Sequence, residues 1–188
     1  PVAVGFFMLF SAKREKVKYY GMMIMGIGLV FYGMGLMGDA MTPLRSFEPF
    51  LDILKSLERP AAGIVAGALF TAIVQSSAAT VGIAIAMASE GLLGLSAGIA
   101  LALGANIGTA VTTALMGILS SKSTEAVRAS VVHVVFNVVG VLLWLPLIWL
   151  LVDIAIWVSP SNPELEGAAK AASEVPRQIA NANTFFNV

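Results

Sequence analysis

The sequence predicts an all-α integral membrane protein, and three observations lead to this class. Hydrophobic residues make up 58% of the 188 residues and charged residues only 12%, whereas soluble domains are roughly half apolar and a quarter charged. The mean hydropathy is +0.89, because apolar segments separated by short polar stretches run through the chain. The 18 glycines suit helices in lipid, where small residues let backbones approach each other closely.

Composition also excludes several classes of protein. The formal net charge is zero, so no basic field would attract nucleic acid, and membrane lipid is the expected surrounding. The absence of cysteine excludes disulfides and thiolate metal sites. We expect a multi-pass protein of the cell membrane, plasma or inner, with a single transmembrane domain over residues 1–188. The chain begins without Met and stops within an apolar segment, so we expect it to be one repeat unit of a longer protein.

The first complete span is predicted over residues 19–40, where glycines and methionines indicate close helix packing rather than a metal-binding methionine box. The positive-inside rule assigns the basic cluster before this span, residues 13–18, to the cytoplasm. Residues 46–58 have apolar residues at helical spacing with charged residues between them. This pattern predicts an amphipathic helix that lies in the membrane interface.

Residues 60–90 predict a re-entrant hairpin. Its two apolar arms, residues 61–74 and 78–89, are each shorter than the ~20 residues that a helix needs to cross a bilayer. The polar cluster Gln75-Ser76-Ser77 lies between them, and polar backbone at membrane depth is tolerated only where protein or a water-filled cavity covers it. We therefore expect the chain to enter the membrane, turn at this cluster and leave on the same side.

Residues 92–119 form the next apolar stretch, interrupted by Gly104-Ala105-Asn106-Ile107-Gly108-Thr109. Two glycines four residues apart are compatible with ordinary close packing of the GxxxG kind. Asn106 with Thr109 and Thr112 is, however, a costly polar cluster for a surface that faces lipid, and the two threonines share a helix face. We therefore expect a broken or kinked transmembrane helix whose polar break faces the hairpin turn.

The C-terminal third predicts a span over residues 125–158, kinked at Pro146. A short polar turn at residues 120–124, which contains Lys122, precedes it on the cytoplasmic side. A polar loop follows the span, and a further element is expected to begin over residues 175–188. Its last six residues, NTFFNV, match HVVFNV of residues 133–138 at three positions, which hints at internal repeats. We interpret His133 as a structural residue rather than a proton shuttle.

The two polar clusters indicate an ion site built from neutral oxygens. Hydroxyls, amide carbonyls and unwound backbone carbonyls are the ligands that sodium takes in transporters, whereas tight calcium or magnesium sites rely on carboxylates. An anion could bind beside the ion, because the helix after the serines presents its free N–H groups to the turn. A polar hairpin tip that packs against Asn106 and binds nothing is the alternative. The candidate ligands are Gln75, Ser76, Ser77, Thr80, Asn106, Thr109 and Thr112.

The sequence also resembles a known family. Gln75-Ser76-Ser77-Ala78-Ala79-Thr80, followed by the segment from Gly104 to Thr109, is similar to the paired signature of type II sodium–phosphate cotransporters. Residues 130–137 and 180–187 resemble the recurring HxxFN-like pattern of that family. The resemblance implies a secondary-transporter fold of two inverted repeats, each with one re-entrant hairpin, and sodium and phosphate bound between them.

The resemblance also implies roles for individual residues. Sodium would be held through Gln75, Ser76, Ser77, Thr109 and Thr112, with Ala78 in the same site. Ala78 stands where the family has a third serine, which removes one hydroxyl. The chain has one such hairpin, so the other half of the site would come from a second repeat in the same protein, from another chain or from a homodimer partner.

The function expected from these observations is sodium-coupled transport of inorganic phosphate. The alternative is a non-transporting membrane scaffold or regulator that retains the family fold. We do not expect an enzyme, because the sequence contains no Ser–His–acid set, carboxylate pair or metal cluster at membrane depth. No cofactor is expected other than sodium as the coupling ion.

Overall fold

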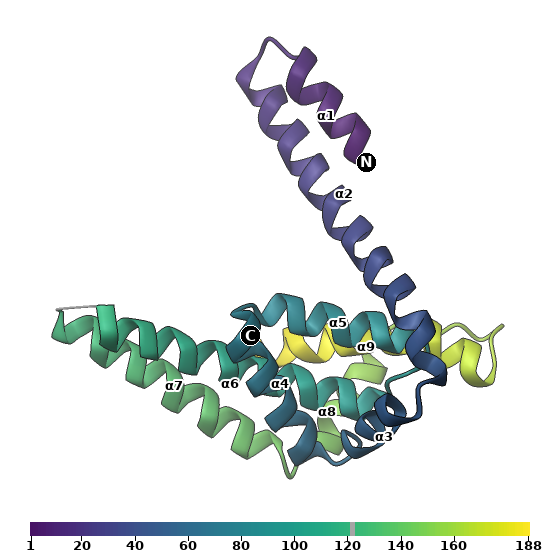
Figure 1. The fold of residues 1–188 in the computed structure, drawn as a ribbon, viewed down its shortest axis with the longest axis vertical. Coiled ribbons are helices and arrows are strands. Elements are labelled where there is room, and N and C mark those ends of the chain that lie inside the picture. Colours follow the sequence, from purple (N-terminus) through teal and green to yellow (C-terminus); the bar gives the residue numbers. More distant parts are fainter. Residues whose placement is uncertain (121–122) are drawn as a thin grey trace. The chain divides into compact units, whose positions relative to one another are not determined.

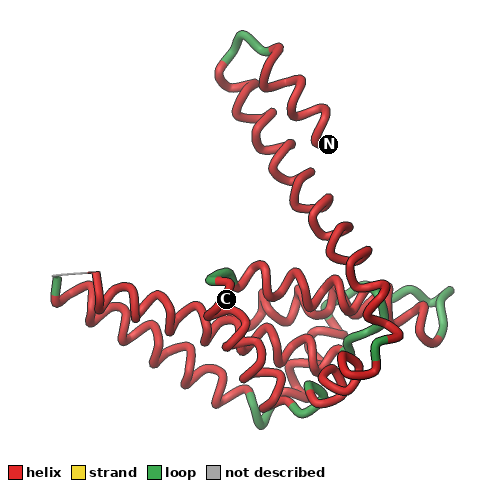
Figure 2. Tube along the Cα trace, in the orientation of Figure 1, coloured by secondary structure: helices red, strands yellow, loops and turns green. Residues whose placement is uncertain are grey.

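All regular elements that the structure describes are helices, as the sequence predicts (Figure 1 and Figure 2). The structure is a computed structural model and describes residues 1–120 and 123–188. The polar turn predicted at residues 120–124 includes Lys122, which lies outside the described residues. The chain divides into two compact units, Pro1–Ala40 and Met41–Val188, where the sequence suggested a single domain. That the whole chain is one repeat stays a prediction.

The first unit is built from α1 (Val2–Ser11) and most of α2 (Glu15–Met41). The two helices approach most closely at glycines: a Cβ added to Gly5 would lie 2.5 Å from Gly21 O, and one added to Gly21 would lie 2.8 Å from Gly5 O. The predicted packing role of the glycines is therefore confirmed at this pair. In contrast, Gly26, Gly33 and Gly35 have no neighbour within 4 Å of such a Cβ.

The second unit begins with the short helix η1 (Thr42–Ser46) and the amphipathic helix α3 (Glu48–Ser56). Leu54 and Leu57 are buried, whereas Ile53 is exposed, so α3 has the two faces that the sequence predicts. The chain then bends by 112° into α4 (Pro60–Val74), where Pro60 takes the first helical position because that position needs no N–H donor. The helix α5 (Ser77–Ser89) returns from the end of α4 and completes a helical hairpin.

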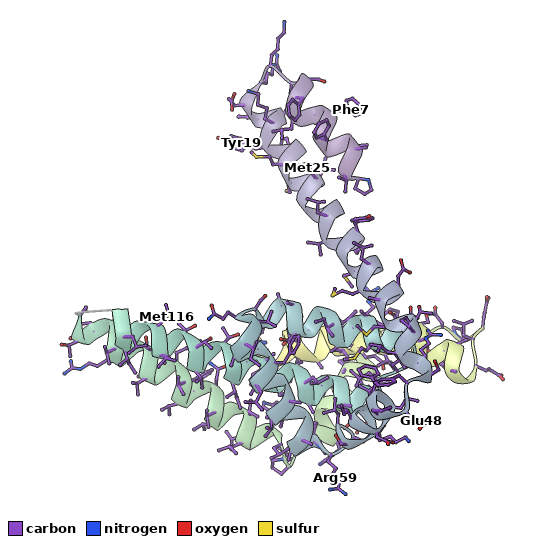
Figure 3. All side chains as sticks on the ribbon, viewed as in Figure 1. Phe7, Tyr19, Met25, Glu48, Arg59 and Met116 are labelled. Atoms are coloured by element: carbon purple, nitrogen blue, oxygen red, sulfur yellow. The ribbon has the colours of Figure 1, made fainter. Side chains whose placement is uncertain are left out.

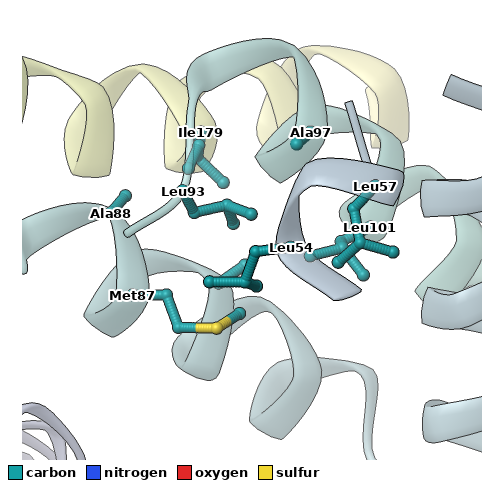
Figure 4. Close-up of a cluster of buried hydrophobic side chains, with 9 residues drawn as sticks. Leu54, Leu57, Met87, Ala88, Leu93, Ala97, Leu101 and Ile179 are labelled. Carbon is teal, nitrogen blue, oxygen red and sulfur yellow. The ribbon is translucent and has the colours of Figure 1, made fainter. Parts of the chain in front are cut away.

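The central element of this unit is α6 (Leu95–Ser120), which contacts α4, α5, α7, α8 and α9. A first hydrophobic cluster joins α3, α5, α6 and α9 around Leu54, Met87 and Ile179 (Figure 4). A second cluster joins α4, α6, α7, α8 and α9 around Ile99 and Leu151. Residues 97–103 of α6 therefore contribute side chains to both cores, just before the polar residues of this helix.

The predicted break in the helix over residues 92–119 is wrong, because α6 is continuous from Leu95 to Ser120. Gly104 and Gly108 instead allow backbone-to-backbone packing against α4: a Cβ on Gly108 would lie 2.5 Å from Ala68 O, and one on Gly104 would overlap Ile64 O. The polar side chain of Asn106 donates a hydrogen bond to Ala102 O of its own helix. The Asn106 amide thus bonds to its own helix without unwinding, and ordinary GxxxG packing is the correct interpretation of the two glycines.

The span predicted over residues 125–158 is two helices, α7 (Thr124–Trp144) and α8 (Ile148–Trp157). Proline has no N–H to donate and its ring clashes with the preceding turn, so Pro146 breaks the helix where the sequence suggested a kink. The last helix, α9, spans Gly167–Asn187 with Pro176 inside it. It begins earlier than the predicted residue 175 because the alanine-rich residues 168–174 are strong helix formers.

Glu174 fixes the loop that precedes α9. Its Oε1 accepts hydrogen bonds from the Asn162 backbone N–H at 2.7 Å and the Ser161 hydroxyl at 3.0 Å. The bond from the Asn162 N–H, followed by the Ser161 bond and the Lys170 charge, lowers the pKa of Glu174 against the opposing effect of desolvation. Asn162 also donates from Nδ2 to Ser173 Oγ at 2.6 Å. The first turns of α9 and its loop are therefore held together.

Three helical segments of the described residues, or four if the bent α3–α4 pair counts as one, are long and apolar enough to cross a membrane. The three are Glu15–Ser46, Leu95–Leu119 and Thr124–Trp144. Large apolar side chains project outward from the helices in both units, among them Phe7, Tyr19 and Met116 (Figure 3). Such exposure is expected of helices that lipid surrounds, and the predicted membrane class is confirmed.

We expect Gly104→Ala to lower the free energy of unfolding in detergent by about 1–3 kcal/mol, because overpacking at a tight contact forces backbones apart. Gly26→Ala is the matched control, since no atom lies within 4 Å of its Cβ. The control should be neutral or stabilising by up to about 1 kcal/mol, the helix propensity of alanine over glycine. Equal stability of the two variants in thermal unfolding would contradict the α4–α6 contact.

Candidate functional site

The turn of the hairpin consists of Gln75 and Ser76. Gln75 has φ 58° and ψ 28°, in the left-handed region, and is the only non-glycine residue with positive φ in the described part of the chain. This conformation ends α4 and lets the Gln75 N–H donate to Thr71 O at 2.6 Å. Ser76 then caps α5, because its Oγ accepts the Ala79 N–H at 3.2 Å. Strained backbone of this kind gathers at functional sites.

A buried hydrogen bond between Thr71 and Thr80 joins the two arms of the hairpin. Their hydroxyl oxygens are 2.6 Å apart, and the residues are only 0% and 4% exposed. The Thr80 hydroxyl can also donate to Ser76 O at 3.3 Å, in which case Thr71 is the donor to Thr80. Thr80, predicted as a ligand, thus holds the arms together close to the turn.

A cavity of about 420 Å³ lies between the hairpin turn, the middle of α6 and the end of α9. Ser77 and Ala78 line it from α5, and Asn106 lines it from α6. The structure therefore brings one member of each polar cluster, Ser77 and Asn106, to one cavity. The remaining lining residues are Val81, Asn183, Thr184, Asn187 and Val188, and no described residue of the lining has an ionisable side chain.

The other predicted ligands lie outside this lining. Gln75 is exposed, and Ser76 is half-buried as the cap of α5. The Thr112 hydroxyl donates to the backbone of its own helix, with Gly108 O and Thr109 O both at 3.0 Å. His133 is exposed on α7 and does not line the cavity.

The hydroxyl of Thr109 is buried and has no hydrogen-bond partner among the described residues. An unpaired buried hydroxyl costs about 1–3 kcal/mol. Thr109 is three residues from Asn106 and Thr112, so the three share one face of α6. Thr109 does not line the cavity, so its hydroxyl is a buried polar group without a partner among the described residues.

Asn183, Thr184 and Asn187 line the cavity although they were not among the ligands predicted from the sequence. One signal could have identified them: residues 183–188 match residues 133–138 at three positions. The structure gives the two segments the same local bond, because Asn137 Nδ2 donates to His133 O at 2.9 Å and Asn187 Nδ2 donates to Asn183 O at 2.7 Å. The second copy of the pattern is the one that faces the cavity.

The arrangement suits an uncharged site for small ions. Every polar side chain of the described lining ends in a hydroxyl or an amide, and the start of α5 adds backbone N–H groups. The first N–H groups of a helix have no acceptor within the helix, and the helix dipole makes this end positive. The cavity can thus present oxygens to a cation and N–H groups to an anion.

Comparison with known proteins gives one family and several relatives. The family described as Na+/Pi-cotransporter matches residues 46–150. The uncharacterized protein YqeW of Bacillus subtilis is 29% identical over 186 residues, which are 98% of this chain and 56% of YqeW. No solved structure matches the chain.

Two mammalian relatives match a shorter segment. Sodium-dependent phosphate transport protein 2A of Rattus norvegicus is 39% identical over 103 residues, which are 51% of this chain and 16% of that protein. The human protein 2B is 36% identical over 94 residues, or 48% of this chain and 14% of that protein. The chain thus spans about half the length of YqeW and a smaller share of the two transport proteins.

We expect Thr80→Val to destabilise the protein more than Thr71→Val. Thr80→Val leaves the buried Thr71 hydroxyl without its partner, at about 1–3 kcal/mol, whereas Thr71→Val leaves Thr80 bonded to Ser76 O. The double variant should lose less than the sum of the two single losses. Thermal unfolding of the three variants in detergent measures this coupling, and strictly additive losses would contradict the bond between the arms.

Proposed function

The chain belongs to the Na+/Pi-cotransporter family, and from this premise we propose that it forms part of a transporter that couples the movement of inorganic phosphate to sodium. Family membership and the membrane-capable helices make it a multi-pass protein of the plasma membrane. The observation that supports the proposal is the uncharged polar cavity where the hairpin turn meets α6. A second hairpin, from another repeat or another chain, would complete the site.

Sodium is proposed to bind through the oxygens of Gln75, Ser76, Ser77, Thr109 and Thr112. Several of these hydroxyls already take part in hydrogen bonds, but a hydroxyl that donates its proton keeps lone pairs for a cation. Thr112 is such a case, since its proton is directed to backbone carbonyls. The unpaired hydroxyl of Thr109 supports its inclusion most directly.

Phosphate is proposed to bind at the start of α5. Ser77 and Ala78 are the first two residues of this helix and line the cavity, so their N–H groups are available to an anion. Arg and Lys are absent from the described lining, and a bound sodium ion would supply positive charge in their place. Ala78 leaves room where a serine would place a hydroxyl, so the substrate would rely on backbone donors at this position.

We expect the intact protein in proteoliposomes to take up radiolabelled phosphate faster with an inward sodium gradient than without one. Ser77→Ala should lower the sodium-driven rate about tenfold or more, because losing one ligand contact costs about 1.4 kcal/mol. Ser89→Ala, at the opposite end of α5, is the matched control and should transport normally. Phosphate uptake at the same rate with and without a sodium gradient would exclude sodium coupling. If the folded protein takes up no phosphate, the alternative of a non-transporting scaffold or regulator is favoured.

Thr109→Val separates a ligand from a merely unpaired hydroxyl. We expect this variant to be more stable by about 1 kcal/mol, since it removes a buried polar group without a partner. Its transport should nevertheless require more sodium for half-maximal uptake. Thr113→Val, at an exposed position of α6, serves as the control. An unchanged sodium requirement in Thr109→Val would exclude Thr109 from the site.

A further inference from the structure

The wall of the cavity that α9 supplies has polar side chains of its own. Helix α9 packs beside α5 and α6, and its C-terminal end lies near the turn between α4 and α5 (Figure 1). Asn183 and Asn187 are four residues apart and so share one face of α9. Both line the cavity, together with Thr184, opposite Ser77 and Asn106.

Three side-chain donor groups on the α6 and α9 walls, those of Asn106, Thr184 and Asn187, donate to acceptors on their own helices. Asn187 Nδ2 donates to Asn183 O at 2.7 Å and to Asn183 Oδ1 at 3.2 Å. Asn106 Nδ2 donates to Ala102 O at 3.0 Å, and the Thr184 hydroxyl donates to Ala180 O at 3.0 Å. The donors are thus turned toward their own helices, whereas Oδ1 of Asn106 and Oδ1 of Asn187 accept no hydrogen bond from the described residues.

The cavity therefore has two chemically different sides. The α5 side presents N–H groups at the positive end of a helix, which favours an anion. The α6 and α9 side presents the amide oxygens of Asn106 and Asn187 and the Thr184 hydroxyl, whose proton is directed to Ala180 O, and such oxygens favour a cation. Neutral oxygens without a carboxylate suit a monovalent cation, since tight calcium sites need acidic ligands.

We propose that α9 supplies cation ligands to this site, and that Asn187 Oδ1 binds the coupling sodium ion together with Asn106 Oδ1 and Ser77 Oγ. The assignment deepens the proposed function and rests on it, because it names residues that hold the ion in sodium-coupled transport. The assignment adds α9 to α5 and α6, the two helices that contain the paired sequence motifs. Sodium then lies between α6, α9 and the Ser77 hydroxyl, and phosphate lies beside it, against the backbone N–H groups at the start of α5.

Binding of radioactive sodium to the intact protein in detergent, without phosphate, tests the assignment. Asn187→Ala should weaken sodium binding about tenfold, equivalent to about 1.4 kcal/mol. Asn187→Asp keeps an oxygen at the same place but loses the amide donor, so it should bind sodium nearly as well as the wild type. The added carboxylate should also let calcium compete with sodium. Asn181→Ala is the matched control on α9, because Asn181 donates to Ser159 Oγ and does not line the cavity.

If Asn187→Ala binds sodium with wild-type affinity, the assignment is overturned. It is also overturned if Asn187→Ala and Asn187→Asp lose the same sodium affinity, because that result would indicate a role for the amide donor alone. If Asn187→Ala does not fold, Asn187→Asp decides: calcium that fails to compete with sodium contradicts the assignment. Sodium-driven phosphate uptake by the wild type distinguishes failure of the proposed function from failure of the Asn187 assignment alone. Without such uptake the proposed function fails, whereas normal uptake with unaffected variants rejects only the role of Asn187.

Discussion

The close contact between α4 and α6 is the constraint on which the rest of the second unit depends. Gly67 of α4 meets the backbone of Leu101, while Gly104 and Gly108 of α6 meet the backbones of Ile64 and Ala68. In lipid, helices associate through such close packing because burying apolar surface gains little there. With α4 fixed on α6, Ser77 at the start of α5 and Asn106 of α6 line one cavity. A Cβ at any of these three glycines would overlap the backbone of the facing helix.

Much of the fold could be predicted from the sequence, because segment length and composition carry the signal. The two short apolar arms and the polar Gln75-Ser76 turn are sufficient to indicate a hairpin. Segment length and composition could not predict whether the helix is continuous. Glycines such as Gly104 and Gly108 occur both where two helices pack closely and where a helix unwinds. Local hydrogen bonds decide between them, because the Asn106 amide N–H and the Thr112 hydroxyl donate to backbone carbonyls of the intact helix.

In the candidate site, too, the residues within sequence motifs could be predicted, whereas the contacts between distant segments could not. Ser77, Ala78 and Asn106 could be identified from their motifs, and they line one cavity. The contribution of α9 depends on the path of the chain from Pro146 through the loop that Glu174 holds. The residues of α9 and those next to it in the sequence do not indicate this path. The helical hydrogen bonds of Asn106 and Asn187 are equally invisible in the sequence, yet they determine which of their atoms remain free for a ligand.

The bond between Thr71 and Thr80 has a mechanical consequence. It joins the arms beside the turn, and the glycine contact attaches α4 to α6, so Ser77 of the hairpin and Asn106 of α6 belong to helices that are linked through α4. Neither helix pair can open without breaking a buried hydrogen bond or a backbone contact. Helix α9 is attached differently, because apolar side chains such as the fully buried Ile179 hold it against α5 and α6.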